Sequence, residues 1–164
     1  MIISIDPGLE YFAAAKWDKN GVFLGANFYD IPTTQNDIGK RAVTTAQLFS
    51  GVFDDLLRNE CNVVVFERPV VYPKSKAPPM DILALYGAVT AMATVVDMRF
   101  VRAEFVEPRK WKGNVPKAVF GKRIESRLTP KEQKLAQLDR FPKTQRHDVV
   151  DAIGIGLWWL GRMR

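Results

Sequence analysis

Residues 145–159 read QRHDVVDAIGIGLWW, and this stretch decides how the rest of the chain is interpreted. After its first aspartate the stretch is apolar except for Asp151, which predicts a helix buried in the protein interior. We expect this helix to begin near His147 and to remain apolar to Leu160. Asp148 and Asp151 stand at its start and share one face, because positions three apart differ by only about 60° around a helix.

Two acids on the packing face need an explanation, because ionised carboxylates are rarely buried without a partner. One interpretation is attraction to the positive N-terminal end of the helix, which is worth about 0.3–1 kcal/mol per charge. That attraction accounts for exposed acids better than for acids that face a core. The other interpretation is that the start of the helix forms one wall of a cation site.

The remaining pattern predicts three strands, a helix, a strand, a helix, a strand, a basic insert and the final helix. The Asn20-Gly21 pair suits a tight turn, so the first three strands are expected to form an antiparallel meander. Small residues at 84, 87, 88 and 91 predict close packing of the second helix on the sheet. The expected ranges are 1–5, 11–17, 22–29, 38–57, 62–67, 80–96, 98–106, 107–146 and 147–160.

Strand–helix–strand units imply parallel pairing through right-handed crossovers. The expected fold is therefore α/β, with a mixed five-stranded sheet, an antiparallel meander followed by parallel strands, and helices on both faces. The length of 164 residues predicts a single domain over residues 1–164.

Charge is distributed unevenly along the chain. Residues 107–146 hold twelve Lys or Arg and four Asp or Glu, which leaves the remainder of this +6 chain slightly acidic. A basic segment of this kind favours a polyanion partner such as nucleic acid, although a solvated lysine-rich surface remains an alternative. The single cysteine fits a reducing cytoplasm. The chain shows no signal peptide and no uncharged apolar run long enough for a bilayer, so we expect a cytoplasmic protein without a membrane partner.

Two further acids end apolar strands: Asp6 follows MIISI, and Glu67 closes NVVVFE. If these strands are parallel neighbours, both carboxylates lie at one sheet edge, and the final helix can bring Asp148 and Asp151 alongside. Four clustered carboxylates repel one another unless cations intervene. Hard oxygen ligands select Mg²⁺ or Mn²⁺. Two such ions support phosphodiester cleavage, so we expect about two per subunit.

The segments IISIDPG (2–8), VVVFERP (63–69) and HDVVDAIGIG (147–156) resemble the three acidic motifs of RuvC-type Holliday junction resolvases, which belong to the RNase H-like superfamily. The resemblance runs from residue 1 to about residue 160. It implies that the metal-binding catalytic acids are Asp6, Glu67, Asp148 and Asp151. It also implies a homodimer that nicks two symmetry-related strands of a four-way DNA junction and leaves 5′-phosphate ends. The short chain is similar to compact phage-encoded members.

The segment EPRKWKGNVPK (107–117) carries basic residues suited to the scissile phosphate. Lys112 and Lys117 resemble the catalytic basic residues of the family, and Arg109 or Lys110 could take their place. A solvated loop is the alternative interpretation.

The segment RPVVYPKSKAPP (68–79) corresponds to a loop that carries an aromatic or apolar wedge near the junction centre in this family. Tyr72 could stack on an unpaired base, with Lys74 and Lys76 on phosphates, or it could pack at the loop base or dimer interface. His147, the only histidine, could bind metal, move a proton or cap the helix; we expect a supporting role.

Three other functions compete with junction resolution. An actin-like or sugar-kinase-like phosphotransferase shares an early DxG motif, but it needs a second domain and leaves the final acidic pair without a purpose. A non-catalytic DNA-binding module leaves all four acids unexplained. The strongest alternative is a RuvC-like nuclease acting more broadly on flaps, forks or other branched DNA. No P-loop or zinc-ligand spacing occurs, so no nucleotide cofactor is expected.

Overall fold

The computed structural model describes residues 1–32, 37–57, 61–71 and 78–163, without the side chains of residues 38, 55–57, 117 and 118. Its five strands form one sheet in the order β3-β2-β1-β4-β5. Antiparallel pairing joins β1 to β2 and β2 to β3, and parallel pairing joins β1 to β4 and β4 to β5. The predicted mixed sheet is confirmed. The strands are β1 (Ile2–Pro7), β2 (Tyr11–Trp17), β3 (Phe23–Asp30), β4 (Val63–Glu67) and β5 (Arg102–Val106).

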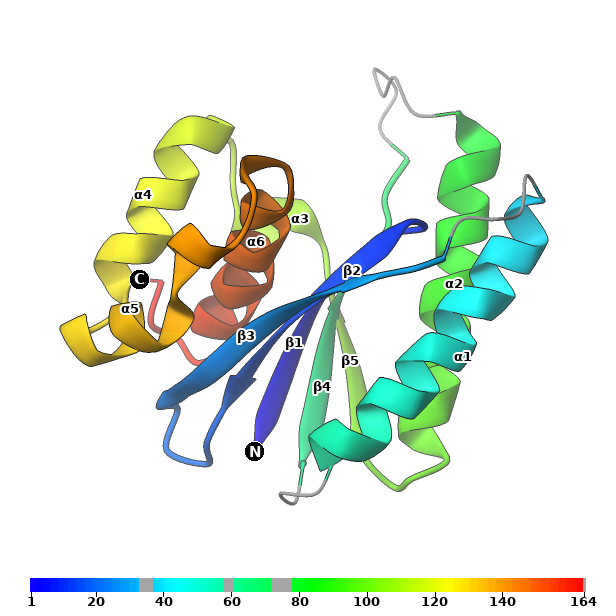
Figure 1. Cartoon of the computed structure of the whole chain (residues 1–164), viewed down its shortest axis with the longest axis horizontal. Helices are drawn as coiled ribbons and strands as arrows, with labels where there is room; N and C mark the ends of the chain where they lie inside the picture. The colour runs from blue at the N-terminus through cyan, green and yellow to red at the C-terminus, as the bar shows by residue number, and fades with distance from the viewer. Residues whose placement is uncertain (33–36, 58–60, 72–77, 164) are drawn as a thin grey trace.

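Helices cover both faces of this sheet, as predicted (Figure 1). Helices α1 (Ile38–Leu57) and α2 (Pro79–Asp97) lie together on one side. The final helix, α6 (Lys143–Trp159), crosses β1 and β2 on the other side. The basic insert forms short helices around α6: α3 (Pro108–Trp111), α4 (Lys117–Arg127), α5 (Pro130–Ala136) and the 3₁₀ helix η1 (Leu138–Arg140).

Alternation along the strands divides the core into two layers. Ile5 and Phe66 face α1 and α2, whereas Ser4 and Val65 face α6. Successive strand residues point to opposite faces. The next residues along β1 and β4 therefore point toward α6, and these residues are acids.

Glycine allows α6 to lie close to the sheet. A Cβ added at Gly156 would stand 2.1 Å from Nε1 of Trp17 and 2.7 Å from Oγ of Ser4. The buried Ser4 hydroxyl donates to the Ala152 carbonyl at 2.7 Å and accepts from Trp17 Nε1 at 3.2 Å. This hydrogen-bonded contact between α6, β1 and β2 fixes the helix directly beside the acidic edge of the sheet.

The predicted start of the final helix near His147 is wrong. Helix α6 begins at Lys143, directly after Pro142, and has no acid in its first turn. Its first residues are polar, so apolar periodicity did not reveal them, whereas Pro142 supplies the extended backbone that precedes the helix. Asp148 and Asp151 consequently lie in the second and third turns. The helix-end attraction fades beyond the first turn, so it does not explain them.

Helix α2 is the one helix in the described ranges that length and composition alone would allow to cross a membrane. In the fold it packs against α1 and β5 through larger apolar residues such as Val89 and Met92. The predicted packing of its small residues is wrong for Gly87, which is exposed, although Ala88 is buried. The larger side chains occupy the inner face, whereas Ala84 and Ala91 are half-buried.

Candidate active site

Two of the four predicted acids meet at the edge where β1 and β4 end. The parallel register pairs Ile5 with Phe66, and the next residues are Asp6 and Glu67. Both side chains follow the alternation that points them toward α6. The parallel pairing of the two strands thus brings together residues that are far apart in the chain.

Helix α6 adds the other two acids above this edge. Asp148 is buried, at 6% exposure, and the Asp151 side chain is 13% exposed. Burial raises the pKa of Asp6 well above its ordinary value, and the charges of Glu67, Asp151 and Asp148 raise it further. Since each of the other three acids acts on Asp6, the four carboxylates form one electrostatic cluster, which we call the acid cluster.

Glu67 is held by Trp111, which the sequence did not identify as a site residue. Nε1 of Trp111 donates a hydrogen bond to Oε2 of Glu67 at 2.9 Å. Burial, and then the charge of Asp151, raises the pKa of Glu67 to about 7, while Lys112 and the Trp111 hydrogen bond lower it. Trp111 therefore orients Glu67 and stabilises its ionised form.

Lys112, the next residue, reaches a different acid. Its Nζ forms an ion pair with Oδ2 of Asp151. The same ammonium lies 5.2 Å from the ring centroid of Trp111 and 5.1 Å from that of Phe120. Cation–π attraction to two rings restrains the lysine. Lys112, which the sequence predicted to approach the scissile phosphate, thus lies within the acid cluster.

His147 and Tyr11 also lie near Asp148. His147 Nε2 lies 2.9 Å from Asp148 Oδ1, and its side chain is 35% exposed. Burial, followed by the charges of Asp148 and Asp6, raises the pKa of Tyr11. The sequence analysis missed Tyr11, although its position on β2 faces it toward α6 together with Ala13 and other odd-numbered residues of that strand.

The predicted DNA-contacting residues are placed less completely. Arg109 and Lys110 are exposed on α3, which also ends in Trp111. Helix α4 begins at Lys117, and the side chain of this residue is not among those that the structure describes. Tyr72, Lys74 and Lys76 lie outside the described residues.

The donor chemistry of the acid cluster fits a hard divalent cation. Carboxylate oxygens are preferred ligands of Mg²⁺ and Mn²⁺, and a bound cation relieves the repulsion that raises the pKa of Asp6 and Glu67. Within the described ranges, no three or more His, Cys, Asp or Glu side chains are already arranged as a metal-binding group. Lys112 and Trp111 engage Asp151 and Glu67, respectively.

No protein-family model matches the chain, and no curated protein sequence matches it. Solved structures do resemble it. RuvC of Thermus thermophilus in complex with Holliday junction substrate has a TM-score of 0.65 at 14% identity, over 99% of this chain and 95% of that one. The yeast mitochondrial Holliday junction resolvase has a TM-score of 0.65 at 13% identity, over 99% and 78%. Fowlpox virus resolvase with substrate Holliday junction DNA has a TM-score of 0.59 at 16% identity, over 98% and 99%.

These likenesses extend over nearly the whole of this chain. They show that it has the RNase H-like fold of RuvC-type resolvases, as the three acidic motifs predicted. At this low identity the likeness concerns the fold.

Proposed function

We propose that this protein is a structure-selective endonuclease that resolves four-way DNA junctions by paired symmetric nicks. The observation that carries the proposal is the acid cluster: two strand ends and one helix bring four carboxylates together, with a lysine among them. Three solved structures of the same fold bear the name of a junction resolvase or were determined with Holliday junction DNA.

Asp6, Glu67, Asp148 and Asp151 would hold Mg²⁺ or Mn²⁺, with about two ions per subunit as the expected number. The chemistry that such ions supply is activation of a water and stabilisation of the leaving oxygen in phosphodiester hydrolysis.

The chain's own residues orient the acids and bind the DNA phosphates. Trp111 holds Glu67, and His147 restrains Asp148. The ammonium of Lys112, already inside the acid cluster, can bind a phosphate oxygen at the scissile position once the carboxylates are engaged by cations. The exposed Arg109 and Lys110 on the same short helix would bind flanking phosphates.

Self-association is part of the proposal, because two symmetric nicks call for two active sites related by a twofold axis. The outer face of α2 offers a surface for it. Met80, Leu83 and Tyr86 are 61%, 58% and 39% exposed, at spacings of three residues that keep them on one side of the helix. Phe105 on the edge strand β5 lines a cavity together with Tyr86 and extends this apolar surface.

Leu83→Glu should therefore convert a dimer into a monomer, as measured by sedimentation velocity. Val43→Glu, at a 57% exposed apolar position on α1, is the matched control and should leave the mass unchanged. A wild-type protein that is monomeric at all accessible concentrations would contradict the dimer.

The catalytic proposal is tested by cleavage of matched linear, forked, flapped and four-way DNA with Mg²⁺ or Mn²⁺, with nicks mapped on every strand. We expect paired symmetric nicks confined to the four-way junction, and we expect Asp6→Asn and chelation of the metal each to abolish them. Comparable cutting of forks and flaps would instead favour the broader branched-DNA nuclease. Absence of metal-dependent cutting on every substrate would reject a nuclease.

A further inference from the structure

A small cavity of about 230 Å³ lies between α4 and α6, directly beside the acid cluster. His147 and Asp151 form part of its wall, so the cavity meets two residues of the candidate active site. Lys122 and Lys143 stand on its exposed rim. We name this cavity the Gly121 pocket, after the α4 residue at its surface.

The Gly121 pocket has an apolar floor and an open centre. Phe120 and Val150 close its bottom and are 1% and 5% exposed, so both are fixed in the core. A Cβ added at Gly121 would meet nothing within 4 Å. Glycine inside a helix is destabilising relative to alanine, and it is useful where a ligand approaches the backbone closely. Packing therefore does not require glycine at position 121, and the effect of the missing side chain is to leave space in the pocket.

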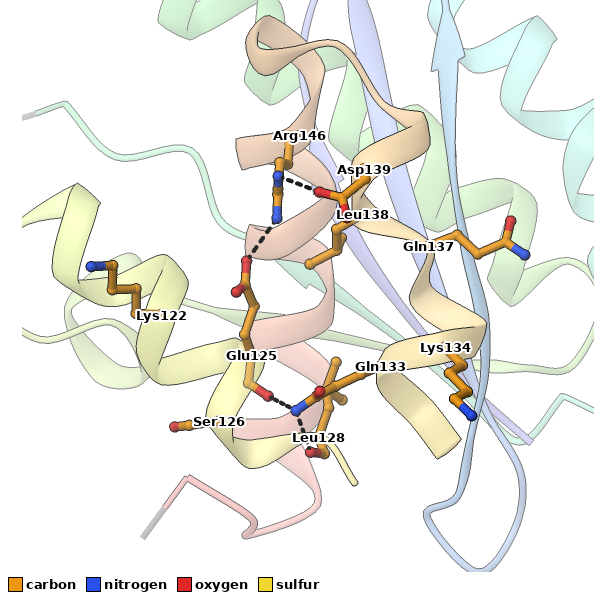
Figure 2. Close-up of a pocket in the computed structure, with 10 residues that line it drawn as sticks. All are labelled: Lys122, Glu125, Ser126, Leu128, Gln133, Lys134, Gln137, Leu138, Asp139 and Arg146. Carbon is orange, nitrogen blue, oxygen red and sulfur yellow. Dashed lines mark hydrogen bonds and ion pairs between the residues drawn. The ribbon is translucent and has the colours of Figure 1, made fainter. Parts of the chain in front are cut away.

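An ion pair forms the far boundary of the pocket. Arg146 binds Glu125 at 3.1 Å and Asp139 at 2.9 Å. Beyond it lies a larger cavity of about 560 Å³, bordered by α4, α5 and η1 (Figure 2). Lys122 lines both cavities. The Arg146 ion pair thus limits the Gly121 pocket to one small ligand beside the acid cluster.

We propose that the Gly121 pocket binds one nucleotide of the cut strand, next to the scissile phosphate, and so contributes to the choice of cleavage sequence. This inference rests on the proposed nuclease function. The pocket is smaller than the roughly 300–1,000 Å³ of sites for drug-sized ligands. The apolar floor of the pocket can stack on the face of a base, and its polar wall can hydrogen-bond to the base edges. Lys122 and Lys143 can form ion pairs with the adjoining phosphates.

The decisive variant is Gly121→Leu, which fills the pocket from an open helical position. Gly51→Leu is the matched control, because Gly51 is also a helical glycine with nothing within 4 Å of an added Cβ, and it lies on α1 across the sheet. Affinity for a four-way junction is measured by fluorescence anisotropy in Ca²⁺, with intact junctions and with junctions carrying one abasic site at each nucleotide flanking the mapped nicks.

In the wild type, one abasic position should weaken binding by about five-fold or more, which corresponds to the loss of one base contact. Gly121→Leu should weaken binding of the intact junction similarly, and the same abasic site should then cause little further loss. Nick mapping on junctions with varied flanking bases should show a sequence preference for the wild type and for Gly51→Leu that Gly121→Leu loses.

A second variant tests the rim. Lys143→Gln should reduce by about one the slope of log affinity against log salt. Lys19→Gln, an exposed lysine in the β2–β3 turn at the opposite end of the sheet, should leave the slope unchanged.

The possible failures are separable. If the wild type cuts junctions and Gly121→Leu retains wild-type affinity, abasic response and sequence preference, the pocket proposal is overturned while the nuclease stands. If the wild type neither binds nor cuts branched DNA, the wild-type measurements alone reject the nuclease, and the pocket proposal falls with it.

Discussion

Replacing Glu67 by glutamine should stabilise the metal-free protein, and increasingly so as the pH rises. Burial, and after it the charge of Asp151, holds the folded-state pKa of Glu67 at about 7, above its usual value of 4.5. The folded protein therefore binds more protons than the unfolded chain between these two values. In that interval the free energy of unfolding falls as the pH rises.

The size of the effect follows from the displacement of the pKa. A difference of about 2.5, at about 1.36 kcal/mol for each pKa unit, amounts to roughly 3 kcal/mol. The wild type should lose this stability between about pH 4.5 and pH 8, whereas Glu67→Gln carries no charge there to lose. The variant should thus be close to the wild type near pH 5 and more stable by up to roughly 3 kcal/mol near pH 8.

The assay is urea denaturation in EDTA at a series of pH values, followed by circular dichroism. Repeating it with saturating Mg²⁺ should stabilise the wild type at pH 8 more than the variant, since the wild type retains the ligand. A stability difference that stays constant from pH 5 to pH 8 in EDTA would refute the electrostatic account of the acid cluster.

Glu132→Gln provides a control of opposite sign. Glu132 is 4% exposed and binds Arg162 at 2.7 Å, and this partner lowers the pKa of the carboxyl to about 2. The ionised Glu132 carboxylate contributes to the free energy of unfolding above about pH 4.5, and this contribution is lost as the pH falls toward 2. This variant should be destabilised by roughly 3 kcal/mol near pH 7, and the difference should shrink in acid.

Two further predictions concern the contacts around α6 and α3. Gly156→Ala should lower the free energy of unfolding by about 1–3 kcal/mol or more, because its Cβ would lie 2.1 Å from Trp17 Nε1. If urea denaturation instead showed a gain in stability from helix propensity, it would contradict the close packing. Trp111→Phe and Lys112→Gln each remove a group that lowers the pKa of Glu67. The acidic limb of the pH–rate profile for junction cleavage should therefore move to higher pH in both variants. An unmoved limb would count against the effect of these two residues on Glu67.

The acids of the candidate site could be identified from the sequence because each is attached to an apolar element. Asp6 and Glu67 end runs of buried strand residues, and Asp148 and Asp151 interrupt an otherwise apolar helix. The alternation of β1 and β4 and the parallel crossover then imply that their side chains meet. Periodicity is a local property, so the sequence was sufficient for the order of elements and the mixed sheet.

The contacts that orient these acids depend on tertiary packing. Trp111 has the same local sequence pattern whether it anchors a short helix or donates to Glu67, and only the packing of α3 against α6 decides between the two roles. Likewise, the Gly121 pocket exists because α4 lies against α6, and no spacing in the basic insert encodes that contact.

The sequence by itself determined the order of the strands and main helices and identified the four carboxylates, because hydrophobic periodicity and the cost of burying a charge are local properties. The predicted strand 98–106 is wrong before Arg102, where a turn follows α2 and β5 has not yet begun. Tertiary structure alone decided where α6 begins, which partner each acid takes and where a cavity remains beside them. Those features depend on distances between segments that are remote in the chain. These distances are set only when the helices pack against the two faces of the sheet.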